Sequence, residues 1–286
     1  MWAGPRVTVA ARSSIVRWAQ RHGWIDEARS IEEIGMHGLY DRHADISPRT
    51  IEALRGFDCI VSLLGGCWET VSERLAEVSK GNVITIDPNP SPRRAAHIVE
   101  HWVEQIRGYG LSIEVPTGDE LEMRDRRTLR EQLRFRLKAT KERIVLCHPG
   151  SGGLEKCCPH IVFERIVEEL KARGSSVAWM IGPDETERFG PEYVRRLEQT
   201  APVLYEESVE LAADLVSGAD VFIGNDAGMT HVAALGGVKT IALFGPTDPI
   251  IWHPLGPDCT VVSFTHDDQA IDALVREVVA YRIGRE

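Results

Sequence analysis

The stretch GNDAGMTHVAALGG brings an acid, an imidazole and several glycines within a few positions. It stands between two apolar runs, which predicts a strand before it and a helix within it. Asp226 would then lie where the strand ends, at the edge where open α/β sheets bind ligands. The spacing is equally compatible with two uses. Asp226 could cap the helix, or the amides of Ala227, Gly228 and Met229 could stay free to bind a diphosphate. His231, in the first helical turn, would reach the same anion.

A second candidate is the loop HPGSGGLEKCCP, which follows the apolar run RIVLC. Its glycines, Gly152 among them, let backbone amides approach a ligand closely, and such amides attract anions. Ser151 adds a hydroxyl group and Lys156 a mobile positive charge. The loop has neither the Walker A ending nor the pattern G-x-G-x-x-G, so a phosphate loop and an ordinary loop both remain open. His148 is interpreted as a packed or capping residue rather than a catalyst.

Two more predicted strands end in polar residues. In WMIGPDETER, Asp184 and Glu185 could accept hydrogen bonds from ribose hydroxyls or serve as helix-start charges. In FGPTDPIIWHPLGP, Thr247 and Asp248 stand beside prolines, and the loop is equally compatible with a rigid connection. Four such loops at one sheet edge indicate a nucleotide-sized cleft.

The elements that position these loops alternate along the chain. Strands are predicted at RVTVAA, FDCIVSLLG, NVITID, RIVLCHPG, SSVAWMIG, DVFIGND and TIALFG, with amphipathic helical patterns between them. Continuous apolar strands are typical of parallel sheets buried on both faces, so the pattern predicts a doubly wound α/β fold. A highly charged segment predicts a division into an N-terminal domain (1–118), a linker (119–142) and a C-terminal domain (143–286). The last helix, DDQAIDALVREVVAYR, could pack on either domain.

Composition argues against several classes of protein. The 286 residues carry 33 basic and 43 acidic side chains, a net charge of -10, which disfavours non-specific nucleic-acid binding. No apolar stretch approaches the roughly 18 residues of a membrane span, and the N-terminus has no secretory pattern. The six cysteines form no paired C-x-x-C spacing, so a zinc site is not predicted. We expect a cytoplasmic protein with reduced thiols.

The motifs HPGSGGLEKCCP, IGPDETE and, above all, FIGNDAGMTHVAALGGVKTIALFGPTDPIIWHPLGP resemble the family 9 glycosyltransferases, the ADP-heptose:lipopolysaccharide heptosyltransferases and their relatives. The resemblance covers the second half almost continuously and extends more weakly into AAHIVEHWVEQIRGYGL. It implies a GT-B fold, in which two Rossmann-like domains face a cleft. It also implies inverting transfer of a sugar, most simply heptose, from an ADP-sugar to an acceptor like the lipopolysaccharide core, at the cytoplasmic membrane face.

The resemblance also implies roles for individual residues. Lys156 would offset negative charge on the leaving nucleoside diphosphate and act with His231 as the catalytic pair. The implied donor-binding residues are Ser151, Gly152, Lys156, Asp184, Glu185, Asp226, Ala227, Gly228, Met229 and His231. No metal and no cofactor is implied beyond the nucleotide-sugar substrate. The implied partners are that donor, a saccharide or lipid-linked saccharide acceptor and, peripherally, the membrane, but no nucleic acid.

The sequence departs from the family pattern in three places. The family opens with a strand and a Gly-Asp loop whose acid acts as general base, whereas PRVTVAARSS resembles the family's second strand. We therefore expect a shortened N-terminal domain and assign no general base, a group that contributes typically 10²- to 10⁴-fold. Cys158 stands where the family commonly has Trp, and Ala227 where many relatives have Ser or Thr.

Three alternatives remain beside the transferase. The missing acid favours a degenerate, non-catalytic sugar-nucleotide binder. A UDP-sugar 2-epimerase would share the fold but need cleft acids that the sequence does not place. A structural or partner-binding α/β protein would need neither Lys156 nor His231. Arg12, Arg93 and Arg94 could contact an acidic acceptor or be solvated surface charges.

Overall fold

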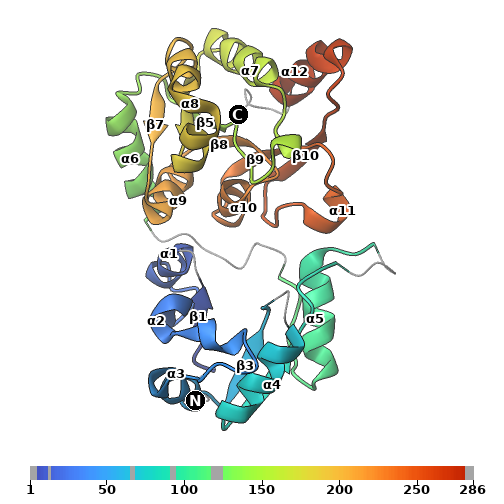
Figure 1. The fold of residues 1–286 in the computed structure, drawn as a ribbon. Helices are drawn as coiled ribbons and strands as arrows, with labels where there is room; N and C mark the ends of the chain where they lie inside the picture. Colours follow the sequence, from blue (N-terminus) through green and yellow to red (C-terminus); the bar gives the residue numbers. More distant parts are fainter. Residues whose placement is uncertain (1–4, 12–13, 65–67, 91–94, 117–124, 281–286) are drawn as a thin grey trace. The chain divides into compact units, whose positions relative to one another are not determined.

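The computed structural model describes the chain in five stretches, which are 5–11, 14–64, 68–90, 95–116 and 125–280. Arg12, Arg93 and Arg94, the candidate acceptor contacts, lie outside these stretches. The chain divides into two compact units, Met1–Val115 and Pro116–Glu286, and strands and helices alternate in each (Figure 1).

The first unit contains two pairs of short parallel strands with helices between them. Its elements are β1 (Thr8–Ala11), α1 (Ile15–Arg21), β2 (Glu27–Ser30), α2 (Ile31–Ile34), η1 (Met36–Leu39), α3 (Pro48–Arg55), β3 (Cys59–Ser62), α4 (Trp68–Val78), β4 (Asn82–Thr85) and α5 (Ile98–Gly108). β1 pairs with β2, and β3 pairs with β4. Leu39, Leu54 and Leu75 join η1, α3 and α4 in one buried core. The predictions for β1, β3 and β4 are confirmed, whereas β2 was not predicted because its sequence, EARS, is mostly polar.

The second unit is built on one six-stranded parallel sheet. Its elements are α6 (Arg126–Leu137), β5 (Ile144–His148), η2 (Leu154–Lys156), α7 (His160–Ala172), β6 (Ser176–Ile181), α8 (Pro183–Glu198), β7 (Val203–Tyr205), α9 (Val209–Ser217), β8 (Val221–Asn225), α10 (Gly228–Leu235), β9 (Lys239–Phe244), α11 (Pro249–Trp252), β10 (Cys259–Ser263), η3 (Asp268–Ala270) and α12 (Ile271–Ala280). The strand order is β10-β9-β8-β5-β6-β7, and every neighbouring pair is parallel. This is the predicted doubly wound arrangement, and the direction of winding changes between β5 and β8.

Helices cover both faces of this sheet, and the residues of each strand alternate between the two faces. Val145 and Cys147 of β5 lie in the core shared with α7, α8 and α12. Ile144 and Leu146, their neighbours in sequence, lie in the core shared with α6, α9 and α10. Because both faces are buried, β5 is apolar from Ile144 to Cys147 and lacks the polar-apolar alternation of a half-exposed strand.

Two helices outside the predicted alternation belong to the second unit. α12, the last helix, packs on α7 (Figure 1) and buries Val278 in their shared core. α6, which falls within the predicted linker, packs on α9 and buries Leu133 completely. Arg130 of α6 donates to both carboxylate oxygens of Asp220, at 2.8 and 3.2 Å. In the described stretches, no helix combines the length and apolar character that crossing a membrane requires.

Candidate functional site

The loops after β5 and β8 lie together because these strands are neighbours where the winding direction changes. Asn225, the fully buried last residue of β8, joins the two loops. Its Nδ2 donates to the carbonyl oxygens of Pro149 at 2.8 Å and Gly150 at 3.3 Å. Its Oδ1 accepts from the amide of Cys158 at 3.0 Å. The buried amide thus satisfies polar groups at both ends of the β5 loop and fixes that loop to β8.

A lysine, an aspartate and a histidine meet beside these loops. Lys156 Nζ lies 2.9 Å from Asp226 Oδ2, and His231 Nε2 lies 3.8 Å from Asp226 Oδ1. The Asp226 side chain is only 8% exposed, whereas those of Lys156 and His231 are 33% and 37% exposed. The Ser151 hydroxyl donates to the Asp226 carbonyl at 2.7 Å. The structure therefore brings these four predicted site residues together, with two basic groups open to an anionic ligand above a buried acid.

The partners of Asp226 determine its ionisation. Burial by itself would raise the pKa of Asp226. The nearby imidazole of His231 and the hydrogen-bonded ammonium group of Lys156 outweigh that effect and lower the pKa of Asp226 to about 2. The carboxyl group is therefore ionised at neutral pH and serves as the counter-charge of Lys156.

This shift predicts a stability that depends on pH. The folded-state pKa lies below the unfolded value of about 3.9, so the stabilisation is complete above roughly pH 5 and is lost as the pH falls to about 2. We expect it to contribute about 2 kcal/mol to the free energy of unfolding at neutral pH. Urea denaturation between pH 7 and pH 2 should show this loss in the unmodified protein and a shallower loss in Asp226→Asn.

Asp184→Asn is the matched control, because it removes an exposed carboxylate from the same sheet edge. It should leave the difference between pH 7 and pH 2 nearly unchanged. An Asp226→Asn variant with the same pH dependence as the unmodified protein would show that the ion pair does not stabilise the fold.

The sequence did not decide whether Asp226 caps α10 or whether the amides of its first turn stay free for a ligand. The helix begins at Gly228, and its N-cap residue, Ala227, makes no side-chain capping bond. Asp226 does not cap α10 either, since its carboxylate is engaged by Lys156. The capping alternative is therefore wrong. Met229 packs against the core shared by α6, α9 and α10, which leaves its amide rather than its side chain for a ligand.

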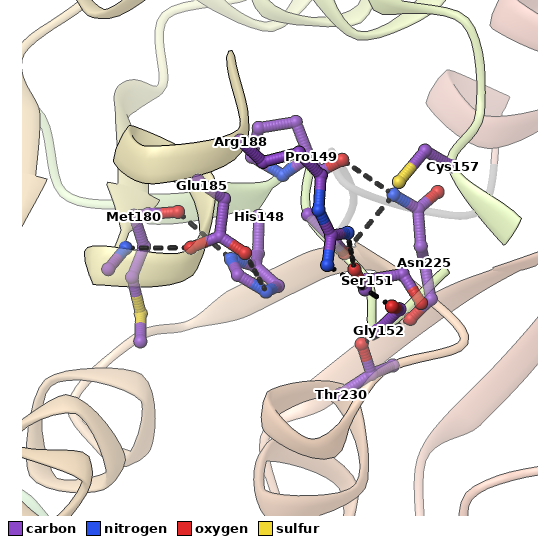
Figure 2. Close-up of polar contacts among 12 residues, drawn as sticks. His148, Pro149, Ser151, Gly152, Cys157, Met180, Glu185, Arg188, Asn225 and Thr230 are labelled. Carbon is purple, nitrogen blue, oxygen red and sulfur yellow. Dashed lines mark hydrogen bonds and ion pairs between the residues drawn. The ribbon is translucent and has the colours of Figure 1, made fainter. Parts of the chain in front are cut away.

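Glu185 and His148 form a buried pair beside the β5 loop (Figure 2). His148 Nδ1 contacts the Met180 carbonyl oxygen at 3.0 Å, and its Nε2 lies 3.9 Å from Glu185 Oε1. Glu185 Oε2 accepts from the Gly182 amide at 2.8 Å, at the start of α8. A Cβ atom on Gly150 would lie 1.9 Å from Glu185 Oε1, so a side chain at this position would displace Glu185. His148 is thus packed, as predicted, and Glu185 is a helix-start charge that also faces the loop.

The remaining candidates have mainly structural surroundings. Asp184 is exposed in the first turn of α8. Asp248 accepts from the Ile250 amide at 2.9 Å and caps α11, as a rigid connection requires. Cys158 is 1% exposed, and burial raises its pKa to about 12, so the thiol stays protonated.

Two contributors were missed by sequence reasoning. The hydrogen bonds by which Asn225 fixes the β5 loop were not predicted. Arg188, on α8, donates to two carbonyl oxygens of the same loop (Figure 2). Its position one helical turn after Glu185 was the available signal, because residues three apart share a helix face.

Comparison with known proteins supports the fold and the family. The model of "Glycosyltransferase family 9 (heptosyltransferase)" matches residues 81–276. Lipopolysaccharide heptosyltransferase 3 of Escherichia coli is 33% identical over 114 residues, which are 38% of this chain and 33% of that protein. Lipooligosaccharide heptosyltransferase 2 of Haemophilus influenzae is 29% identical over 124 residues, 42% of this chain and 36% of that protein. These alignments thus span about a third of each relative.

The solved structure of the E. coli ADP-heptose lipopolysaccharide heptosyltransferase II matches with a TM-score of 0.68. The match covers 98% of this chain and 92% of that one at 17% sequence identity. A likeness at this identity concerns the fold alone, and it confirms the expected GT-B class.

Proposed function

This chain belongs to glycosyltransferase family 9, and from that membership we propose that it transfers a sugar from a nucleotide-sugar donor to a saccharide acceptor. The observation that carries the proposal is the meeting of Lys156, Asp226 and His231 beside the uncapped first turn of α10. These groups lie where the sheet changes its winding direction, the position at which doubly wound folds bind nucleotides. The similar proteins are named as heptosyltransferases, which favours ADP-heptose as donor and a lipopolysaccharide-core-like acceptor.

The proposed reaction is a direct displacement. A hydroxyl oxygen of the acceptor forms a bond to the anomeric carbon while the bond from that carbon to the diphosphate oxygen breaks. The configuration inverts, the diphosphate leaves with the electron pair, and the acceptor hydroxyl loses its proton. We assign that proton to no residue of the described part of the chain.

Lys156 and the α10 amides stabilise the charge that grows on the leaving diphosphate. Positive and N–H groups that already face the developing negative charge stabilise the transition state, because they need not reorganise during the reaction. Asp226 keeps Lys156 in place through their 2.9 Å contact. His231 is half-exposed beside the same carboxylate and can donate to a phosphate or sugar oxygen. The membrane contact and the cytoplasmic location belong to the proposal as well, since an acceptor of this kind is made at that surface.

Calorimetry with ADP-, UDP- and GDP-sugars tests the donor part of the proposal. We expect ADP-heptose or ADP to bind, and the Lys156→Ala, His231→Ala double variant to bind at least tenfold more weakly, because both basic groups face the diphosphate. Binding by none of the three nucleotide classes would overturn the proposal. Binding without transfer to any saccharide acceptor would favour the non-catalytic binder, and interconversion of UDP-sugars would favour the epimerase.

A further inference from the structure

Arg188 makes a two-pronged contact with the loop after β5 (Figure 2). Its Nη1 donates to the carbonyl oxygen of Ser151 at 2.5 Å, and its Nη2 donates to that of Gly152 at 3.2 Å. The two carbonyl groups are consecutive in the chain, so one planar guanidinium group spans both. Both carbonyls must therefore point toward α8.

The direction of these carbonyls sets the direction of two amides. In a trans peptide the N–H group points opposite to the carbonyl group of the same peptide unit, and the described residues contain no cis peptide. The N–H groups of Gly152 and Gly153 therefore point away from Arg188. Neither donates a hydrogen bond within the described part of the chain. Two neighbouring N–H groups that point to the same side can bind one anion together, as the amides of backbone nests do.

The loop is also held by the last residue of β8 and by the residue after it. Asn225 binds the carbonyl of Pro149, and the Ser151 hydroxyl binds the carbonyl of Asp226. Lys156, three residues after Gly153, belongs to the same loop. The loop is thus fixed at its beginning by β8 and at its centre by α8, while the amides of Gly152 and Gly153 make no hydrogen bond to other described residues.

We propose that Arg188 is a positioning residue, which turns the Gly152 and Gly153 amides toward the diphosphate of the donor. The inference rests on the proposed function in one respect, the identity of the anion. It adds a residue outside the Lys156, Asp226 and His231 cluster, one that acts on the ligand through the backbone. Since the Arg188 side chain is exposed on the surface of α8, its replacement should leave the fold intact.

The test compares Arg188→Gln and Arg188→Lys by calorimetry with ADP, inorganic pyrophosphate and adenosine. We expect Arg188→Gln to weaken ADP and pyrophosphate by about 10- to 100-fold, the loss of one or two amide bonds to a charged group, and to leave adenosine unchanged. Arg188→Lys should recover only part of the loss, since one ammonium group cannot span both carbonyls. Arg195→Gln is the control for charge, because Arg195 lies in the part of α8 after the break at Gly190 and pairs with Glu192 instead.

Each outcome decides the inference. Equal ADP binding by the unmodified protein and Arg188→Gln overturns it and leaves the proposed function standing. Full recovery in Arg188→Lys, or a comparable loss in Arg195→Gln, also overturns it, because charge alone would then explain the effect. If the unmodified protein binds pyrophosphate but no nucleotide, the proposed donor is wrong, and the pyrophosphate series still decides the role of Arg188. Binding of neither overturns both proposals.

Discussion

Lys156→Ala should lower the rate of sugar transfer by about 10²- to 10³-fold. This is the usual loss when one preorganised hydrogen-bond donor to a developing negative charge is removed. The Lys156 ammonium group contacts the buried carboxylate of Asp226, yet 33% of the Lys156 side chain is exposed, so a diphosphate can reach it. The effect should fall mainly on kcat, because the leaving diphosphate carries more charge in the transition state than in the bound donor. The measurement is ADP release from ADP-heptose in the presence of a saccharide acceptor, with kcat and KM determined separately.

Two variants show whether position or charge matters. Lys171→Ala removes a lysine near the C-terminal end of α7, where its Nζ bonds the Thr200 carbonyl, and should leave transfer unchanged. Lys156→Arg keeps the charge and should recover part of the rate. Transfer by Lys156→Ala within about threefold of the unmodified rate would remove Lys156 from the mechanism.

The sheet of the second unit was predictable where its strands are buried on both faces. β5, β6, β8 and β9 occupy the interior of the strand order, and each is an apolar run that stands out in the sequence. β7 and β10 lie at the two edges, and neither was among the predicted strands. An edge strand has one neighbour and less burial, so VLY and CTVVS have a weaker apolar signal.

The site was predictable to the level of sheet edges but not of side-chain partners. Lys156 and Asp226 follow two strands that become neighbours, so their meeting follows from topology once the fold is known. The hydroxyl of Ser151 was expected to contact a diphosphate, yet it donates to the Asp226 carbonyl. The clamps by Asn225 and Arg188 join residues 36 or more positions apart, and no local pattern encodes such contacts.

Asp226→Ala should lower the rate of transfer about as much as Lys156→Ala, although the carboxylate has the wrong charge to bind a phosphate. We propose that the Asp226 carboxylate acts indirectly, by positioning Lys156 at 2.9 Å and His231 at 3.8 Å. Without the carboxylate, the flexible lysine side chain regains its rotamer freedom. Its ammonium group then spends less time beside the diphosphate oxygen that leaves the sugar. The expected loss is therefore about 10²-fold or more in kcat.

The double variant Lys156→Ala, Asp226→Ala distinguishes this indirect role from an independent one. If Asp226 acts by placing Lys156, the double variant should be about as slow as Lys156→Ala alone, because residues that act as a unit are strongly non-additive. If Asp226 binds the donor sugar independently, the two losses should multiply, and the positioning role is then excluded. Asp226→Asn, which keeps the shape and an oxygen acceptor but removes the charge, should lie close to Asp226→Ala, since it is the ion pair that orders the lysine.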